Sequence, residues 1–121
     1  MKRLFVARLA IMSVFIVSTG LHLMAHHGWA DFDRSKKVKI SGTIIESKYE
    51  NPHCFAKVKA EEGEWAIELS AVPRMKRSGI TAEMIKPGTH VTLVGHPHKN
   101  KAREMKAILM VLDGKTYDLF L

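Results

Sequence analysis

Cysteine is almost absent from this chain, since Cys54 is the only one in 121 residues. A single thiol excludes an intramolecular disulfide framework and paired Cys-x-x-Cys metal motifs, so apolar packing must hold the core together. Free cysteine is usually buried, and we expect Cys54 to be a small buried residue on a strand. An intermolecular disulfide dimer would require this thiol to be accessible.

The sequence also lacks the signatures of the common enzyme classes. No serine, histidine and acid set has a recognised spacing, and no glycine-rich phosphate loop occurs. No carboxylate is clearly placed as a general base, and the clustered carboxylates that a hard cation needs are missing. We therefore expect a protein that is not an enzyme, with a secreted metalloenzyme as the least favoured alternative.

An excess of basic residues gives the whole chain a formal net charge of +7. Three of the 19 basic residues, Lys2, Arg3 and Arg8, lie near the N-terminus, which leaves 16 basic against 12 acidic residues in the remainder. Nucleic-acid binding would need a basic groove with aromatic stacking platforms, and export removes the usual ligand. The sequence therefore predicts no nucleic-acid partner.

The N-terminus follows the plan of an export signal. Lys2 and Arg3 supply positive charge, residues 9–17 form an apolar run, and Ala25 offers a cleavage position. We expect a signal peptide at 1–25 and one domain at 26–121, located in the periplasm or secreted. The alternative is an uncleaved membrane anchor over residues 4–25.

The remaining pattern is that of strands with a helical connection. Alternating apolar residues or turn signals delimit strands at 38–44, 55–60, 65–70, 90–95, 105–112 and 117–121, and short helices at 72–79 and 81–85. Three strands, one or two short helices and further strands follow the order of an OB-like barrel. We predict a mainly β fold, a small OB-like barrel of five to six strands, with an open sandwich as the alternative.

Histidine is the unusual component, with six imidazoles after residue 25. His26 and His27 stand at the predicted new N-terminus, and His53 follows the Asn51-Pro52 break. After cleavage at Ala25, His26 would offer its α-amine and its imidazole as a chelating pair, which His27 or His53 would complete. Such a set of nitrogens favours Cu(II), and zinc on three histidines is the second choice. A cut one or two residues earlier would make a histidine the third residue of the processed chain, and a histidine at that position also suits Cu(II).

Weaker metal candidates are His90, His96 and His98, which share one side of an extended segment, together with Met75 and Cys54. The alternative is structural: the terminal pair is a solvated tail, His53 hydrogen-bonds a turn, and the methionine is core. A basic cluster of Arg74, Lys76 and Arg77 is the candidate for contact with an acidic protein or polysaccharide.

Several marks in order along the chain resemble a known family. They include His26-His27-Gly28, Asn51-Pro52-His53, Ile67-Glu68-Leu69, Arg74-Met75, Gly95 and Asp113-Gly114. The chain is similar to a family of small exported bacterial proteins of uncharacterised function. The resemblance implies an envelope location and an OB-like domain, and it implies no activity or cofactor.

Together these observations predict a periplasmic protein that binds copper or a similar transition metal as a carrier, buffer or sensor component. His26, His27 and His53 are the expected ligands. The alternative is a metal-free envelope adaptor domain that binds an acidic protein or polysaccharide.

Overall fold

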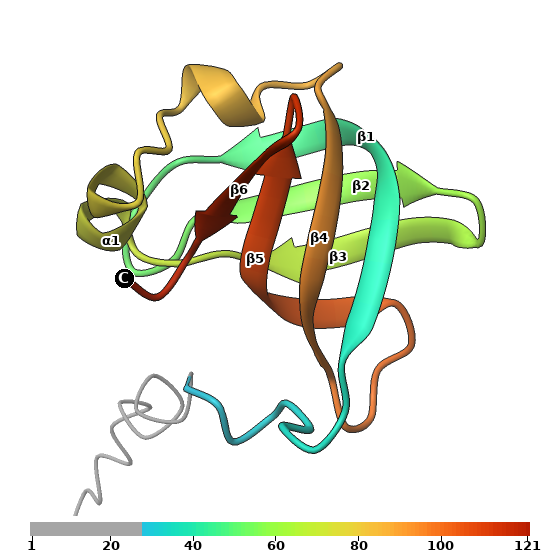
Figure 1. The fold of residues 1–121 in the computed structure, drawn as a ribbon. Coiled ribbons are helices and arrows are strands. Elements are labelled where there is room, and N and C mark those ends of the chain that lie inside the picture. The colour runs from blue at the N-terminus through green and yellow to red at the C-terminus, as the bar shows by residue number, and fades with distance from the viewer. Residues whose placement is uncertain (1–27) are drawn as a thin grey trace, which may run out of the picture.

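The computed structural model describes residues 28–121, and the predicted signal peptide with His26 and His27 lies outside them. These residues form six strands, one short α-helix and one 3-10 turn, and Figure 1 shows how they are arranged. In chain order these elements are β1 (Val38–Lys48), β2 (Phe55–Ala60), β3 (Gly63–Glu68), α1 (Val72–Arg77), η2 (Glu83–Ile85), β4 (His90–Pro97), β5 (Glu104–Leu112) and β6 (Lys115–Asp118).

The sheet closes into a five-stranded barrel with one extra strand. Its order is β3-β2-β1-β4-β5-β6, and β3 also pairs with β5. The β3–β5 pairing is parallel, whereas the others are antiparallel. A barrel closed in this way, with a helical connection between β3 and β4, confirms the predicted OB-like fold.

Two glycines allow neighbouring strands to approach closely. A Cβ added at Gly42 on β1 would lie 2.2 Å from the Lys59 carbonyl oxygen, and one added at Gly95 on β4 would lie 2.2 Å from that of Lys106. Any side chain at either position would therefore push a neighbouring strand outward. The pairing of β1 with β2 contains an irregularity of the β-bulge type, which lies beyond Gly42, between Ile44 and Glu46.

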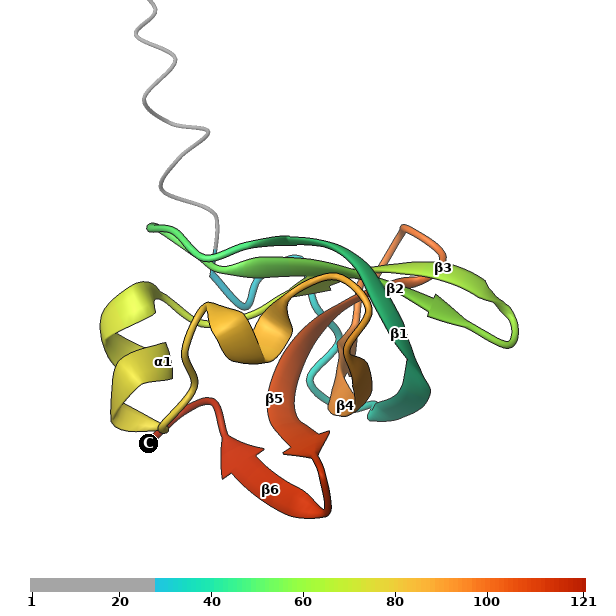
Figure 2. The ribbon, with the colours of Figure 1, turned by 90° about the horizontal axis from the view of Figure 1, so that it is seen from above.

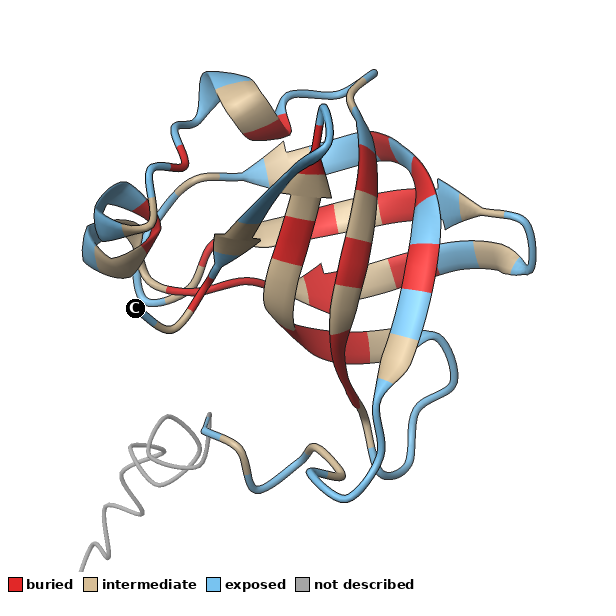
Figure 3. Ribbon diagram, viewed as in Figure 1, coloured by how far each residue is buried: buried red, intermediate tan, exposed pale blue. Residues whose placement is uncertain are grey.

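One hydrophobic core fills the barrel. Buried residues alternate with exposed ones along β1 and with intermediate ones along β4 in Figure 3, and Ile40, Ile44, Val91 and Leu93 are among the buried ones. The connection between β3 and β4 adds four fully buried residues to the same cluster: Leu69, Met75, Ile80 and Ile85. This connection covers the barrel, and Figure 2 shows α1 beside the C-terminus.

The segment before β1 is tied to the barrel by backbone bonds and aromatic contacts. Asp33 N–H donates to the Pro97 carbonyl at 2.8 Å, and Lys99 N–H donates to that of Asp31 at 2.9 Å. Trp29 packs on His96 and on Phe120, with ring centroids 5.5 and 5.1 Å apart. Trp29 therefore anchors this segment to the barrel.

Several predicted elements have other bounds in the structure: β1 continues to Lys48, and β3 begins and ends two residues earlier than predicted. The second helical segment is a single 3-10 turn, and β6 ends at Asp118 rather than at Leu121. The Phe120 N–H donates to the Asp118 carboxylate at 2.7 Å, which turns the chain back from the sheet. Within residues 28–121, no helix has the length and apolar character needed to cross a membrane.

Candidate functional site

The Asn-Pro-His triplet positions His53 between α1 and the end of β3. The Asn51 Oδ1 accepts a hydrogen bond from the Val72 N–H at 2.9 Å and so caps the first turn of α1. Cys54 then pairs with the segment that follows β3. Its N–H donates to the Ser70 carbonyl, and its carbonyl accepts from the Leu69 N–H. His53 is thereby fixed on both sides along the backbone.

The imidazole of His53 faces a carboxylate that also binds a buried lysine. His53 Nδ1 lies 3.4 Å from Glu68 Oε1, and Lys106 Nζ donates to Glu68 Oε2 at 2.8 Å. The Lys106 side chain is 6% exposed, whereas those of Glu68 and His53 are 23% and 26% exposed. The carboxylate therefore joins an ordered imidazole to a buried ammonium group.

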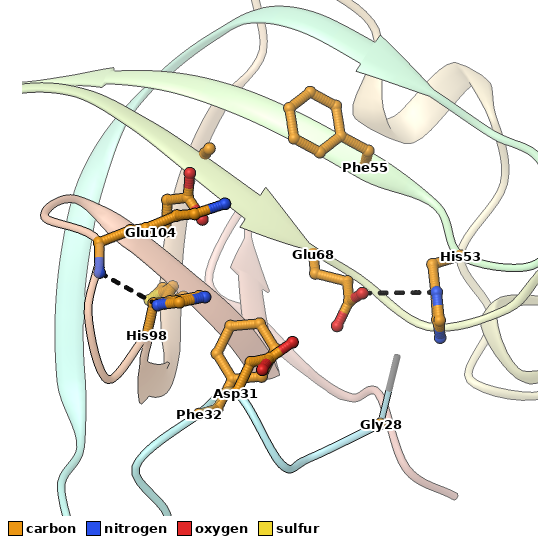
Figure 4. Close-up of a pocket in the computed structure, with 11 residues that line it drawn as sticks. Gly28, Asp31, Phe32, His53, Phe55, Glu68, His98 and Glu104 are labelled. Carbon is orange, nitrogen blue, oxygen red and sulfur yellow. Dashed lines mark hydrogen bonds and ion pairs between the residues drawn. The ribbon is translucent and has the colours of Figure 1, made fainter. Parts of the chain in front are cut away.

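Two adjoining pockets meet at His53 and Gly28, which line both. The first, here called the acidic pocket, has a volume of about 310 Å³ and carries the carboxylates of Asp31, Glu68 and Glu104. Figure 4 shows Glu68 beside His53 and Gly28, with Asp31 and His98 on the other side of the pocket.

The second, the basic pocket, has a volume of about 280 Å³ and no carboxylate among its lining residues. Arg74 and Lys106 supply its positive charge, and Trp29, Phe120 and Ala71 supply apolar surface. Lys106 Nζ lies 5.0 Å from the Trp29 ring centroid, and Arg74 Cζ lies 5.0 Å from that of Phe120. Both cations thus rest on aromatic faces at the wall of one pocket.

His96 and His98 hold the N-terminal segment. His96 is buried, donates from Nδ1 to the Lys36 carbonyl at 2.6 Å and packs edgewise on Trp29. His98 packs edgewise on Phe32, and its Nδ1 accepts from two backbone N–H groups, those of Asn100 and Lys101, at 3.0 Å each. A neutral ring that accepts at Nδ1 carries its proton on Nε2, which leaves no lone pair there for a metal.

The other weak candidates lie apart from His53 or inside the core. His90 is exposed at the start of β4 and lines neither of the two pockets that meet at His53. Met75 and Cys54 are fully buried in the hydrophobic cluster. Burial raises the pKa of the Cys54 thiol, so its thiolate is disfavoured.

The described residues do not make up a metal site by themselves. Between residues 28 and 121, no group of three or more His, Cys, Asp or Glu side chains is arranged to hold a metal ion. The predicted ligands His26 and His27 precede this part. Of the three main candidates, the structure therefore places His53 alone.

The three residues of the predicted basic cluster lie on α1 but differ in exposure. Lys76 and Arg77 are exposed, whereas Arg74 is half-buried and lies over Phe120. Two residues of the site, Glu68 and Lys106, were not predicted. A lysine between Met105 and Ala107, in a run that is otherwise apolar, is the signal that could have indicated Lys106.

The fold and its paired pockets define a small OB-like barrel domain with a charged surface site. The chain belongs to a family of unknown function (DUF6152), whose model matches residues 13–106. This membership agrees with the resemblance to an uncharacterised family. No functionally curated protein matches the sequence.

Solved structures share the fold at low sequence identity. The ZRD-deleted mutant of TiaS in complex with agmatine is 14% identical, with a TM-score of 0.51, over 72% of this chain and 27% of that chain. A complex of TiaS with a transfer RNA and ATP is 14% identical, with a TM-score of 0.50, over 67% of this chain and 19% of that chain. This chain matches only a minor part of each, and the likeness concerns the barrel fold alone.

Proposed function

We propose that this protein binds a transition-metal ion, copper in first place and zinc in second, through His53 together with His26 and His27. In this proposal it is exported to the periplasm or secreted, and serves as a carrier, buffer or sensor component. The observation that carries the proposal is the contact of His53 Nδ1 with Glu68 beside Gly28.

The Glu68 carboxylate favours a proton on His53 Nδ1. A neutral imidazole held in this tautomer has its lone pair on Nε2, which is the arrangement found in carboxylate–histidine–metal sites. In Figure 4 the second ring nitrogen of His53 lies at the tip of the ring, below the nitrogen that faces Glu68. His53 differs in this respect from His98, whose Nδ1 is the acceptor.

The remaining ligands would come from the residues that precede Gly28. Gly28 lines both pockets next to His53, and His27 and His26 directly precede it in the chain. Consecutive Cα atoms are about 3.8 Å apart, so both histidines are within two residues of the pocket wall. Cleavage after Ala25 would add the α-amine of His26 to the donors.

Nitrogen donors of this kind suit copper better than a hard cation. Imidazole and amine nitrogens follow the affinity order that peaks at Cu(II), whereas Mg²⁺ and Ca²⁺ need several oxygen ligands. Zinc would use the same imidazoles in a tetrahedral set.

Native mass spectrometry on protein exported through its own N-terminal sequence, without a tag there, reports the cleavage site and the bound metal together. We expect a mass beginning at His26 with one copper ion. In copper titrations His53→Ala should weaken binding by at least about tenfold, and Glu68→Gln should weaken it by about 10–100-fold.

His90→Ala is the matched control, because His90 is exposed and lies at the far end of β4. Copper affinity that is unchanged in the His26→Ala, His53→Ala double variant would overturn the proposal. A mass that stays metal-free after copper exposure would overturn it as well.

A further inference from the structure

We infer that the basic pocket binds a small organic carboxylate, with Arg74 and Lys106 as the groups that recognise the anion. This inference does not depend on metal binding, although His53 lines the same pocket.

Arg74 supplies the first part of the argument. Its side chain is half-buried against Phe120, and it forms no ion pair with any residue of the described part of the chain. Arginine presents several N–H donors in a planar fork that matches a carboxylate. A guanidinium group held in this way at a pocket wall is suited to an external anion.

Lys106 supplies the second part. Its ammonium group is buried and donates to Glu68, which is its one hydrogen-bond acceptor among residues 28–121. Two of the three ammonium N–H groups therefore remain for a ligand. Since Glu68 balances one cation, Arg74 and Lys106 together leave one net positive charge beside the pocket.

Charge and shape favour a carboxylate over phosphate. One excess positive charge matches a singly charged anion, whereas a phosphate group carries about −1.5 to −2 at neutral pH. Trp29, Phe120 and Ala71 offer apolar surface to an organic body attached to the anion. A volume of about 280 Å³ lies near the lower limit of ligand pockets, about 300 Å³, so the ligand must be small.

The test is calorimetric titration of the full chain with benzoate at low salt, after metal has been removed on a chelating resin so that no soluble carboxylate competes. We expect saturable binding of one benzoate and no binding of benzamide, its neutral counterpart. Arg74→Gln should weaken benzoate binding at least about tenfold, which corresponds to about 1.4 kcal/mol. Arg77→Gln is the matched control, because Arg77 is exposed on the same helix.

A second variant keeps the test valid if Arg74→Gln does not fold. Ala71 lines the pocket and is the N-cap of α1, a position where aspartate is favoured. Ala71→Asp should therefore fold and abolish benzoate binding by placing a carboxylate beside Arg74.

Three results would overturn the inference: no saturable benzoate binding, equal losses in Arg74→Gln and Arg77→Gln, or inorganic phosphate binding as tightly as benzoate. Because the titration is made without metal, its failure leaves the copper proposal standing. Failure of the protein to bind copper would likewise not contradict carboxylate binding in the basic pocket.

Discussion

Glu68 and Lys106 stand directly opposite each other in the short parallel pairing that closes the barrel, and their side chains are joined at 2.8 Å. Only three residue pairs make this β3–β5 seam, which is much shorter than the antiparallel pairings of the barrel. The same carboxylate faces His53. One ion pair therefore links the two strands that close the barrel and also contacts the candidate ligand.

Removal of either partner of this pair should destabilise the fold. We expect Lys106→Met and Glu68→Gln each to lower the free energy of unfolding by about 1–3 kcal/mol, because each leaves a charged group without its partner. The double variant should lose less than the sum, with a coupling energy of about 1–2 kcal/mol in urea unfolding.

The exposed pair of Glu83 and Lys86 is the control for this cycle. Its side chains are 77% and 60% exposed, so a coupling of about 0–1 kcal/mol is expected. Equal coupling in the two cycles would show that the pair of Glu68 and Lys106 contributes no more than a surface contact.

Burial of Cys54 should make the stability fall at alkaline pH. Its pKa is raised in the folded state, so between about pH 8.5 and the raised value the unfolded chain binds fewer protons than the folded one. The free energy of unfolding should decrease as pH rises through this range, and Cys54→Ala should lose that slope.

Urea unfolding at intervals from about pH 7 to about pH 9.5 measures the Cys54 effect. Burial also raises the pKa of Tyr49, but its contribution begins only near about pH 10. A thiol reagent should react with Cys54 only after unfolding. Rapid reaction in the native protein would show that this thiol is accessible and able to form an intermolecular disulfide.

Gly95→Ala tests the close contact between β4 and β5. The added methyl group would meet the Lys106 carbonyl oxygen at 2.2 Å and the Ala107 Cα at 2.8 Å. We expect a loss of about 1–3 kcal/mol in the free energy of unfolding, typical of overpacking. Gly28→Ala is the control, since no atom lies within 4 Å of its added Cβ. An unchanged denaturation midpoint in Gly95→Ala would contradict this account.

The sequence by itself determined the elements and their order, because hydrophobic alternation and turn residues act over a few neighbours. The bounds predicted for the second strand, 55–60, are those of β2, and Asp113-Gly114 forms the turn between β5 and β6. The helical connection places Met75 in the core, as its apolar side chain suggests. These local signals were sufficient to predict an OB-like barrel.

Only the tertiary structure decided which charged and aromatic groups meet. Alternation places His96 and His98 on one side of a strand, but it does not indicate that residues 28–34 return to cover that side. Lys106 is buried because β3 pairs with β5 and Trp29 lies against the Lys106 side chain. Both β3 and Trp29 are far from Lys106 in the sequence. Contacts of this range depend on barrel closure, so no short stretch of sequence contains them.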